Sequence, residues 1–408
     1  SCALALIPSL AFAQTAQQSP PSQDEIIIAD LKIPDVIIVN STRRNSDLQK
    51  IPLSVSAISK SQLENANVHR TQELVAIVPS LQFPQSENSL SVTARIRGIG
   101  TQGTNVGLEP SVGIIIDGVY RARTSVGFTD LGELQSIEVL RGPQSTLYGR
   151  NTSAGLINVN TLRPSFDYGV NAEVGIGNLN LRTASLGFAG AIIEDKLAGS
   201  FFGTIRTRDG FVNVNPNQTN ARKDNSLDYF NVRGQLLYTP NENTQVRIIG
   251  DISEREDSCC NGVVYISDSR AGANTTDIFN YIASLKNNGS IGILRGNQFA
   301  NLNSVTDRSF DQKIFDKGLS VEINSQLSFG KFTSITAYRD WSWAYNQDGE
   351  WSGIDVLYRD LSERPGSGVK SFTQELRLSG QYQKLDWMVG AFLSDEAINN
   401  HYVFKTGA

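Results

Sequence analysis

The residues of this sequence that could perform chemistry are few and far apart. The chain of 408 residues has two histidines, His69 and His401, and three cysteines, Cys2, Cys259 and Cys260. This set lacks the spacing of a zinc site. The sequence also shows no combination of nucleophile and base that would support an enzyme. It therefore predicts no catalytic residue, no metal site and no cofactor.

The adjacent residues Cys259 and Cys260 leave two interpretations open. In an oxidising compartment they can form a vicinal disulfide. They can equally remain two free thiols in a loop, and the sequence alone favours neither.

Two arginines have a more informative setting, because each ends a predicted strand and is followed by glycine. Arg97 precedes Gly98, and Arg141 precedes Gly142 in Leu-Arg-Gly-Pro. The second arginine belongs to the stretch IEVLRGPQSTLYGRNTSAGLINV, residues 137–159, which joins two strands through glycine-rich turns. Such glycines permit tight turns and close approach of the backbone to other groups.

The elements that position these residues follow an export signal. Residues 1–13 form an apolar run that ends in Ala-Phe-Ala, a small-x-small cleavage site. We interpret this run as a partial signal peptide whose beginning is missing. The net charge of −5 does not indicate a nucleic-acid partner. No apolar run approaches the roughly 18 residues that a transmembrane helix needs.

Residues 14–44 read as a tether, because they start with the Gln-, Ser- and Pro-rich segment QTAQQSPPSQD. Two runs of β-branched residues follow, DEIIIAD at 24–30 and DVIIVNS at 35–41. Each has the length of one strand and lies beside flexible sequence. Such a segment can leave its own protein and add a strand to the sheet of another.

Residues 45–163 are predicted to form a mixed α/β domain. A strand at 53–59 leads into a helix with Ser59 as N-cap and Gln62 completing a capping box. A second short helix is expected with Thr71 as its N-cap and with Pro79 ending it. The remaining strands are expected in SVTARIRGIG, GIIIDGVY, QSIEVLRG and GLINVNT.

After Pro164 the chain is predicted to form about nine alternating antiparallel strands. In the segment 321–329 the apolar Val321, Ile323, Leu327 and Phe329 alternate with polar residues. A soluble sandwich would show the same alternation. The turns favour a transmembrane barrel, because short turns alternate with polar inserts of about sixty residues (254–316) and about thirty residues (341–370).

Taken together, these segments resemble the TonB-dependent outer-membrane receptor family. The resemblance is carried, in order, by DVIIVNSTRR, IPLSVSAIS, IRGIG, IDGVY, EVLRGPQSTLYGRNTSAGLINV and SFTQELRLSG. It implies a transmembrane antiparallel β-barrel of about 22 strands with a mixed α/β plug domain inside its lumen. Residues 45–163 correspond to the plug, and residues 165–408 to about the first nine or ten barrel strands. The chain is thus expected to be an N-terminal fragment.

The resemblance also assigns the candidate site residues. The TonB box, the strand that the energising protein TonB captures, is placed at Asp35, Val36, Ile37, Ile38, Val39, Asn40 and Ser41, with 24–30 as the competing position. The expected contacts between plug and barrel wall are Arg97, Gly98, Glu138, Arg141 and Gly142, with Gly149 and Gly155 allowing close approach. The arginines are expected to meet carboxylates of the wall, many of them beyond residue 408. The competing interpretation pairs Arg141 with Glu138 or Asp117 inside the plug.

For function, the resemblance implies active uptake across the outer membrane of a Gram-negative bacterium. The expected partners are TonB with its inner-membrane energising complex, outer-membrane lipid, and a ferric siderophore as ligand. Uptake of cobalamin or an oligosaccharide is the alternative, and a passive porin-like channel is disfavoured by the plug. The aromatic residues assigned to the loops, which stack on a ligand or form the membrane girdle, are Tyr265, Tyr281, Trp341, Trp343, Tyr345 and Trp351.

Overall fold

The structure is a computed structural model of the whole chain. It describes residues 38–39, 43, 46–47, 49, 51–68, 70–85, 92–103, 105–123, 132–263, 275–285, 292–294, 297–360, 366–401 and 403–407. The predicted signal peptide, most of the tether, and Asp35, Val36, Ile37, Asn40 and Ser41 of the predicted TonB box lie outside these residues. None of the helices within them is long and apolar enough to span a membrane.

The described residues from 38 to 163, which we call the plug domain and which include the last residues of the predicted tether, are built on a five-stranded sheet. The strand order is β3-β8-β9-β6-β7, and β6 runs parallel to β9 while the other neighbours are antiparallel. The bounds are β3 Ser54–Ser59, β6 Val112–Ile116, β7 Val119–Arg121, β8 Leu134–Arg141 and β9 Gly155–Thr161. Every residue of β6 is buried, as expected for a central strand covered on both faces.

The first helix of the plug domain is α1, Lys60–Asn65, and its start confirms the predicted capping box. The backbone N–H of Ser59 donates to Gln62 Oε1 at 3.0 Å, and the Gln62 N–H donates to Ser59 Oγ at 3.4 Å. The second predicted helix is a 3₁₀ helix, η2 Thr71–Ala76, and its N-cap is Arg70 instead of Thr71. Thr71 is fully buried, so it packs in the core and does not cap the helix.

Two predicted plug strands are different in the structure. The segment GIIIDGVY is a hairpin of β6 and β7, because Asp117 (φ 51°) and Gly118 (φ 78°) form its two-residue turn. Asp-Gly is a favoured pair for this turn, since both positions need positive φ. The segment SVTARIRGIG contributes only β5, Arg95–Ile96, which pairs with β4, Leu81–Gln82.

The shorter plug elements complete the domain. Strand β1, Ile38–Val39, pairs antiparallel with β2, Ser46–Asp47. Helix α2, Ser145–Tyr148, lies between β8 and β9. The core of the domain is a buried cluster that includes Leu74, Ile96, Ile137 and Ile157, contributed by helix and strands together.

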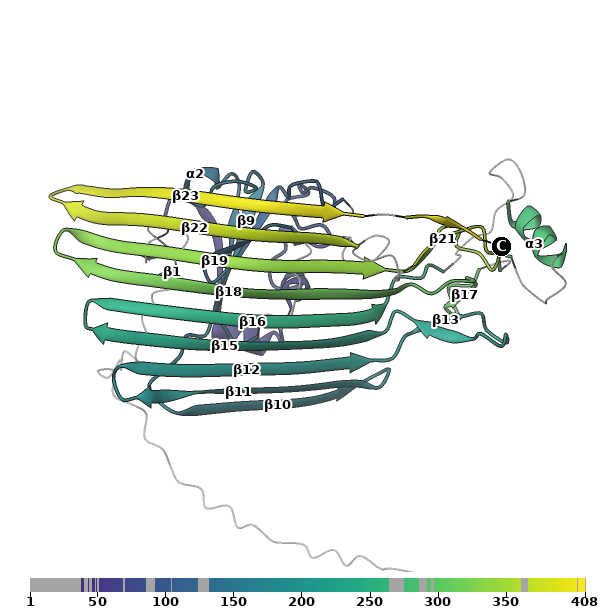
Figure 1. Cartoon of the computed structure of the whole chain (residues 1–408), viewed down its shortest axis with the longest axis horizontal. Helices are drawn as coiled ribbons and strands as arrows, with labels where there is room; N and C mark the ends of the chain where they lie inside the picture. Colours follow the sequence, from purple (N-terminus) through teal and green to yellow (C-terminus); the bar gives the residue numbers. More distant parts are fainter. Residues whose placement is uncertain are drawn as a thin grey trace, which may run out of the picture. The chain divides into compact units, whose positions relative to one another are not determined.

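The second part of the fold is a nine-stranded antiparallel sheet, which we call the wall. Figure 1 shows its strands in the order β10-β11-β12-β15-β16-β18-β19-β22-β23. They are β10 Gly169–Gly177, β11 Leu181–Ile193, β12 Leu197–Arg208, β15 Leu227–Asn241, β16 Thr244–Ser258, β18 Asp311–Leu327, β19 Gly330–Tyr345, β22 Ser367–Tyr382 and β23 Leu385–Asn400. The prediction of about nine antiparallel strands after Pro164 is confirmed.

The two faces of the wall differ in polarity as predicted. Leu319, Phe329, Leu385, Val389 and Leu393 are exposed, although they are large and apolar. The alternate positions carry polar and charged residues that are mostly buried, among them Arg233, Arg247, Asp316 and Arg339. This arrangement is the reverse of a soluble sheet with one wet face, and it is typical of a wall with lipid outside and a polar lumen inside.

Turn lengths differ strongly between the two ends of the wall. One end carries the short turns 194–196, 242–243, 328–329 and 383–384, and the other carries one short turn, 178–180, and the long connections 209–226, 259–310 and 346–366. The last two long connections begin and end inside the inserts predicted at 254–316 and 341–370, because β16, β18, β19 and β22 extend further than expected. We call this second end the long-loop end.

The long connections contain small elements of their own. These are β13 Val212–Val214, β14 Arg222–Asp224, α3 Thr275–Leu285, β17 Asn303–Ser304, β20 Gln347–Asp348 and β21 Leu357–Arg359, with β24 Lys405–Thr406 after the last wall strand. The six strands among them form two three-stranded sheets, β14-β13-β17 and β20-β21-β24. Figure 1 shows β13, β17 and β21 beyond the ends of the wall strands.

Candidate functional site: the interface between plug and wall

The first contact between plug and wall is made by the Asp117-Gly118 turn. The Asp117 carboxylate accepts hydrogen bonds from the Thr161 N–H at 3.0 Å and the Thr161 hydroxyl at 2.7 Å. It also pairs with two wall arginines, Arg247 at 3.3 Å and Arg233 at 3.6 Å. Burial alone would raise the pKa of Asp117, but the two guanidiniums and the Thr161 bonds outweigh it, and the pKa lies below its usual value. Asp117 is therefore a buried anion between two wall cations.

Glycine at position 118 lets this turn approach the wall. A Cβ atom there would lie 2.6 Å from Ile335 Cδ1 of β19, and the positive φ also disfavours any other residue. Next to it Val119 packs with Ile335 and Ala337 in a small buried cluster. The turn is thus fixed by an ion-pair network on one side and an apolar contact on the other.

The wall arginine Arg247 connects this turn to a second plug contact. Its guanidinium donates to Gln235 Oε1 at 2.9 and 2.6 Å and to the Thr161 hydroxyl at 3.0 Å. It also lies 3.9 Å from Glu322, whose carboxylate accepts from Arg163 of the plug at 2.9 Å. Plug and wall therefore contribute charges of both signs to one network.

Two wall glutamates near the other edge of the sheet bind further plug arginines. Glu375 of β22 pairs with Arg43 at 3.2 Å, and Arg43 also lies over the Tyr148 ring at 4.2 Å. Glu396 of β23 pairs with Arg123 at 2.8 Å and also with Arg150. These contacts extend the charged interface across the wall from β15 to β23.

One plug arginine, Arg121, has no ion pair within the described residues. Arg121 is 4% exposed, and its Nε and Nη1 atoms have no hydrogen-bond partner in the described part of the chain. Burial lowers the pKa of Arg121 to about 10, while the wall carboxylates Asp251 and Asp316 oppose that effect. Those carboxylates are already bound by Arg339, at 2.7 and 2.6 Å.

The interface also contains an apolar region, which the sequence did not predict. Trp341 and Trp343 of β19 are 2% and 4% exposed and belong to one buried cluster with Tyr120, Leu140 and Leu156 of the plug. The prediction that both tryptophans serve as loop ligands or membrane girdle is therefore wrong. They face the plug because strand β19 continues to Tyr345 with alternate side chains inward.

Part of this interface borders a polar cavity. A cavity of about 690 Å³ is lined by plug and wall residues together, and most of them are polar. Asp117, Arg163, Arg247, Glu322 and Lys331 are among the lining residues. Such a polar, roomy space suits hydration, so the charges that surround it keep part of their interaction with water.

The arginines predicted as wall contacts have partners within the plug. Arg141 donates to the hydroxyls of Ser80 at 3.0 Å, Ser54 at 3.1 Å and Ser56. Arg97 donates to Ser54 at 3.5 Å. The paired interpretation of Arg141 with Glu138 or Asp117 is not what these contacts show. Contacts of Arg97 and Arg141 with carboxylates of the wall remain a prediction.

The remaining predicted contacts are also located in the plug. Glu138 is 1% exposed and accepts from Asn158 at 3.4 Å. A Cβ atom at Gly98, Gly142 or Gly149 would meet nothing within 4 Å, whereas one at Gly155 would lie 2.4 Å from the Leu140 carbonyl oxygen. These four glycines therefore do not bring the plug close to the described wall. Gly118 does so, and the sequence analysis did not single it out.

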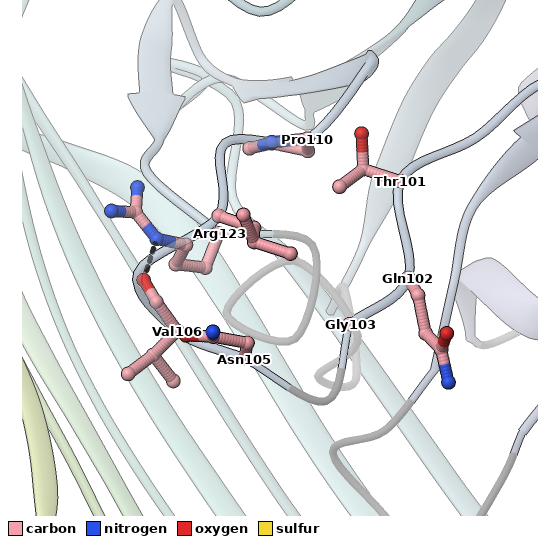
Figure 2. Close-up of a pocket in the computed structure, with 8 residues that line it drawn as sticks. Thr101, Gln102, Gly103, Asn105, Val106, Pro110 and Arg123 are labelled. Carbon is pink, nitrogen blue, oxygen red and sulfur yellow. Dashed lines mark hydrogen bonds between the residues drawn. The ribbon is translucent and has the colours of Figure 1, made fainter.

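A small pocket opens among the plug loops that precede β6. Figure 2 shows Thr101, Gln102, Gly103, Asn105, Val106, Pro110 and Arg123 around it. The Arg123 Nε donates to the Val106 carbonyl oxygen, so the same arginine fixes this loop and pairs with Glu396 of the wall.

The adjacent cysteines are bonded to each other. Cys259 and Cys260 form a vicinal disulfide just after β16. The Gln85 side chain of the plug donates to Cys260 Sγ at 3.0 Å.

Of the other aromatic residues predicted in loops, Trp351 packs against Phe310 with ring centroids 5.0 Å apart, and Tyr345 stacks on Trp343 at 4.1 Å. Tyr281 is exposed on α3, and Tyr265 lies outside the described residues.

Together these observations define a class of protein: a mixed α/β plug held by buried ion pairs against the polar face of a β-wall with an apolar outer face. The sequence profile of the TonB-dependent Receptor Plug Domain matches residues 47–156. Residues 47–156 of this chain are thus a plug domain of the kind found in TonB-dependent receptors.

Known proteins support this assignment. The pesticin receptor of Yersinia pestis is 28% identical over 211 residues, which cover 52% of this chain and 29% of that receptor. The ferrioxamine B receptor of Salmonella typhimurium (strain LT2) is 28% identical over 162 residues, 39% of this chain and 22% of that receptor.

Among solved structures, the ferric yersiniabactin uptake receptor FyuA from Yersinia pestis superposes with a TM-score of 0.68 at 17% identity, over 87% of this chain and 50% of FyuA. The siderophore receptor PiuA from Acinetobacter baumannii gives a TM-score of 0.62 at 16% identity, over 86% of this chain and 46% of PiuA. The chain thus spans about half the length of the structures that it matches, and these similarities concern the fold.

Proposed function

We propose that the protein takes up a scarce ligand, a ferric siderophore, across the outer membrane by TonB-dependent active transport. The observation that carries this proposal is the plug itself, held in place by buried ion pairs beside a hydrated cavity. A domain that only seals a lumen could be held by a continuous apolar contact. Charged contacts beside water can exchange partners during a rearrangement, because water replaces a lost partner at little cost.

The choice of ligand follows from the relatives. Pesticin and ferrioxamine B receptors and a ferric yersiniabactin uptake receptor are among the proteins that this chain resembles. Vitamin B12 transporters of Vibrio vulnificus are also similar, at 24% identity over 182 residues for one strain, so cobalamin is the second candidate. In this proposal the long-loop end faces the outside and receives the ligand.

The partner in energy supply is TonB, and the proposed capture site is the TonB box at 35–41. Support comes from β1, because Ile38 and Val39 pair with Asp47 and Ser46 of a two-stranded ribbon. A two-stranded pairing this short has marginal stability, so the segment can be released and can add to a sheet of the partner.

Uptake of radioactive iron bound to a siderophore, in iron-starved cells, tests the proposal. We expect uptake to stop when an uncoupler removes the proton gradient, while binding to the cell surface persists. Labelled cobalamin serves as the alternative ligand in parallel. Uptake that continues without the gradient would indicate a passive channel and contradict the proposal.

A pair of proline variants distinguishes the two candidate boxes. Ile38→Pro removes a backbone donor from the proposed box, and Ile27→Pro does the same in the competing segment 24–30. We expect Ile38→Pro to abolish energised uptake with ligand binding unchanged, and Ile27→Pro to have little effect. The opposite result would assign the box to 24–30.

A further inference from the structure

Three carboxylates from two different connections meet at the long-loop end. Asp307 lies in the connection 259–310, shortly after β17, while Asp348 ends β20 and Glu350 follows in the next turn. One carboxylate oxygen from each residue lies within 4.8 Å of the other two. The two connections are therefore joined at a point where negative charge is concentrated.

The central member of this cluster is a fully buried carboxylate with one free oxygen. Asp348 is 0% exposed. Its Oδ1 accepts the backbone N–H groups of Glu350 at 3.1 Å and Trp351 at 2.6 Å. Its Oδ2 is buried and has no hydrogen-bond partner among the described residues, and the same holds for Asp307 Oδ1. Buried, unsatisfied anionic oxygens are costly, so a ligand that binds both would stabilise the site.

Neighbouring cations do not neutralise the cluster. Arg308 is the nearby guanidinium, and its two-point contact is with Asp355, through Nε at 3.2 Å and through Nη2. Its Nε also lies 3.4 Å from Asp307 Oδ2. Neither Asp348 nor Glu350 has an ion pair within the part of the chain that the structure describes. Arg308 thus pairs with Asp307 and Asp355 and leaves the charges of Asp348 and Glu350 without a cation among the described residues.

Hydrogen bonds within the turn fix the position of the cluster's carboxylates. Glu350 accepts the backbone N–H groups of Val356 at 2.8 Å and Leu357 at 2.9 Å, which fixes its carboxylate beside Asp348. Trp351 packs against Phe310, so the two connections also share an apolar contact. The carboxylates are held in place by these bonds before any ligand arrives.

We propose that Asp307, Asp348 and Glu350 form a Ca²⁺ site that joins the two long connections. All the oxygens offered are carboxylate oxygens, and the set is irregular, which suits Ca²⁺ better than the strict octahedron of Mg²⁺. The cluster contains no imidazole or thiolate, the ligands that favour zinc and copper. Backbone carbonyls and water would complete the coordination. The site is independent of the proposed uptake function.

Calorimetric titration of the purified protein in detergent, after treatment with a chelator, tests the site. We expect Ca²⁺ to bind with a Kd of about 10⁻⁴ to 10⁻³ M, the range of extracellular calcium modules. We expect weaker binding of Mg²⁺, because the irregular set of carboxylates does not offer its octahedron. Asp348→Asn should lower the affinity for Ca²⁺ at least about tenfold, since it removes one charged ligand.

The matched control is Asp311→Asn, an exposed carboxylate at the start of β18, which should leave Ca²⁺ binding unchanged. Hydrogen exchange of the unmutated protein guards against a variant that fails to fold. Added Ca²⁺ should protect backbone amides at 303–310 and 347–357. The proposal is overturned if the unmutated protein binds no Ca²⁺, if Asp348→Asn binds it equally well, or if the protection appears elsewhere.

Discussion

The substitution Asp117→Asn probes the contact that the structure places at the centre of the plug–wall interface. It keeps the shape of the side chain and removes its charge. Asp117 is 4% exposed and lies between Arg247 and Arg233, which are 3% and 7% exposed. In the variant Arg233 loses the carboxylate that pairs with it among the described residues. Arg247 keeps Gln235 and the more distant Glu322.

The size of the effect follows from this geometry. Removing one partner of a buried ion pair costs about 3–5 kcal/mol, because the remaining charge stays buried. We expect a value of about 3 kcal/mol, at the lower end, since Asn can still accept the Thr161 N–H and the cavity beside Arg247 is hydrated. At 1.4 kcal/mol for each factor of ten, plug release becomes more frequent by a factor of roughly 100 to 200.

Leakage through the outer membrane measures plug release. Cells that produce the Asp117→Asn protein should admit a large antibiotic that the intact outer membrane excludes, and should do so without ligand or proton gradient. The control is Asp340→Asn, which removes a partly exposed pair with Lys317 at 3.8 Å and should cost about 0–1 kcal/mol. Equal sensitivity of the two variants, at matched amounts in the membrane, would refute the importance of the Asp117 network.

Three further predictions test the same interface. Gly118→Ala should increase leakage more than Gly98→Ala. Both residues have positive φ, but only a Cβ at position 118 would lie 2.6 Å from Ile335 Cδ1. Equal leakage of the two variants would show that backbone strain alone matters. Acid should release the plug only below about pH 4, because the pKa of Asp117 is lower in the folded state than in the unfolded state. The stabilisation from ionised Asp117 is present above the unfolded-state pKa and is lost as pH falls through the folded-state pKa. A change in the fluorescence of Trp341 and Trp343 between about pH 5 and 8 would contradict this prediction. Glu396→Gln should loosen the loop of Figure 2, since Arg123 loses its carboxylate, and faster hydrogen exchange at 105–110 than in Glu375→Gln would confirm it.

Features that depend on neighbouring residues were predictable from the sequence. The capping box of Ser59 and Gln62 is local, because both partners lie within one turn of helix. The alternation along each wall strand is also local, and it identified all nine strands and the polar face. The Asp-Gly turn was equally local, and giving weight to this pair would have predicted the β6–β7 hairpin.

Features that depend on which surfaces meet could not be predicted. Trp341 and Trp343 look like loop or girdle residues until β19 is known to continue past them on the plug side. The partners of Asp117 come from β15 and β16, more than one hundred residues further along the chain, and no local pattern links them. Arg97 and Arg141 were identified by their sequence setting, but their described partners are serines of the plug.

The carboxylate cluster illustrates the same limit at the long-loop end. Asp307 and Asp348 belong to different connections, and each is surrounded by ordinary loop sequence. Only the packing of these connections, including Phe310 against Trp351, brings the two side chains together. A sequence search for metal-ligand spacing therefore passes over them.

A reversible cross-link between plug and wall tests most directly the central claim that the plug must move against the wall for uptake. Cysteines introduced at Val119 and Ala337, which pack in one buried cluster, would join the two parts, in a chain where Cys259 and Cys260 are replaced by serine. We predict that oxidation stops energised uptake, that a reducing agent restores it, and that ligand binding is the same in both states. Undiminished uptake by a fully cross-linked population would contradict the account.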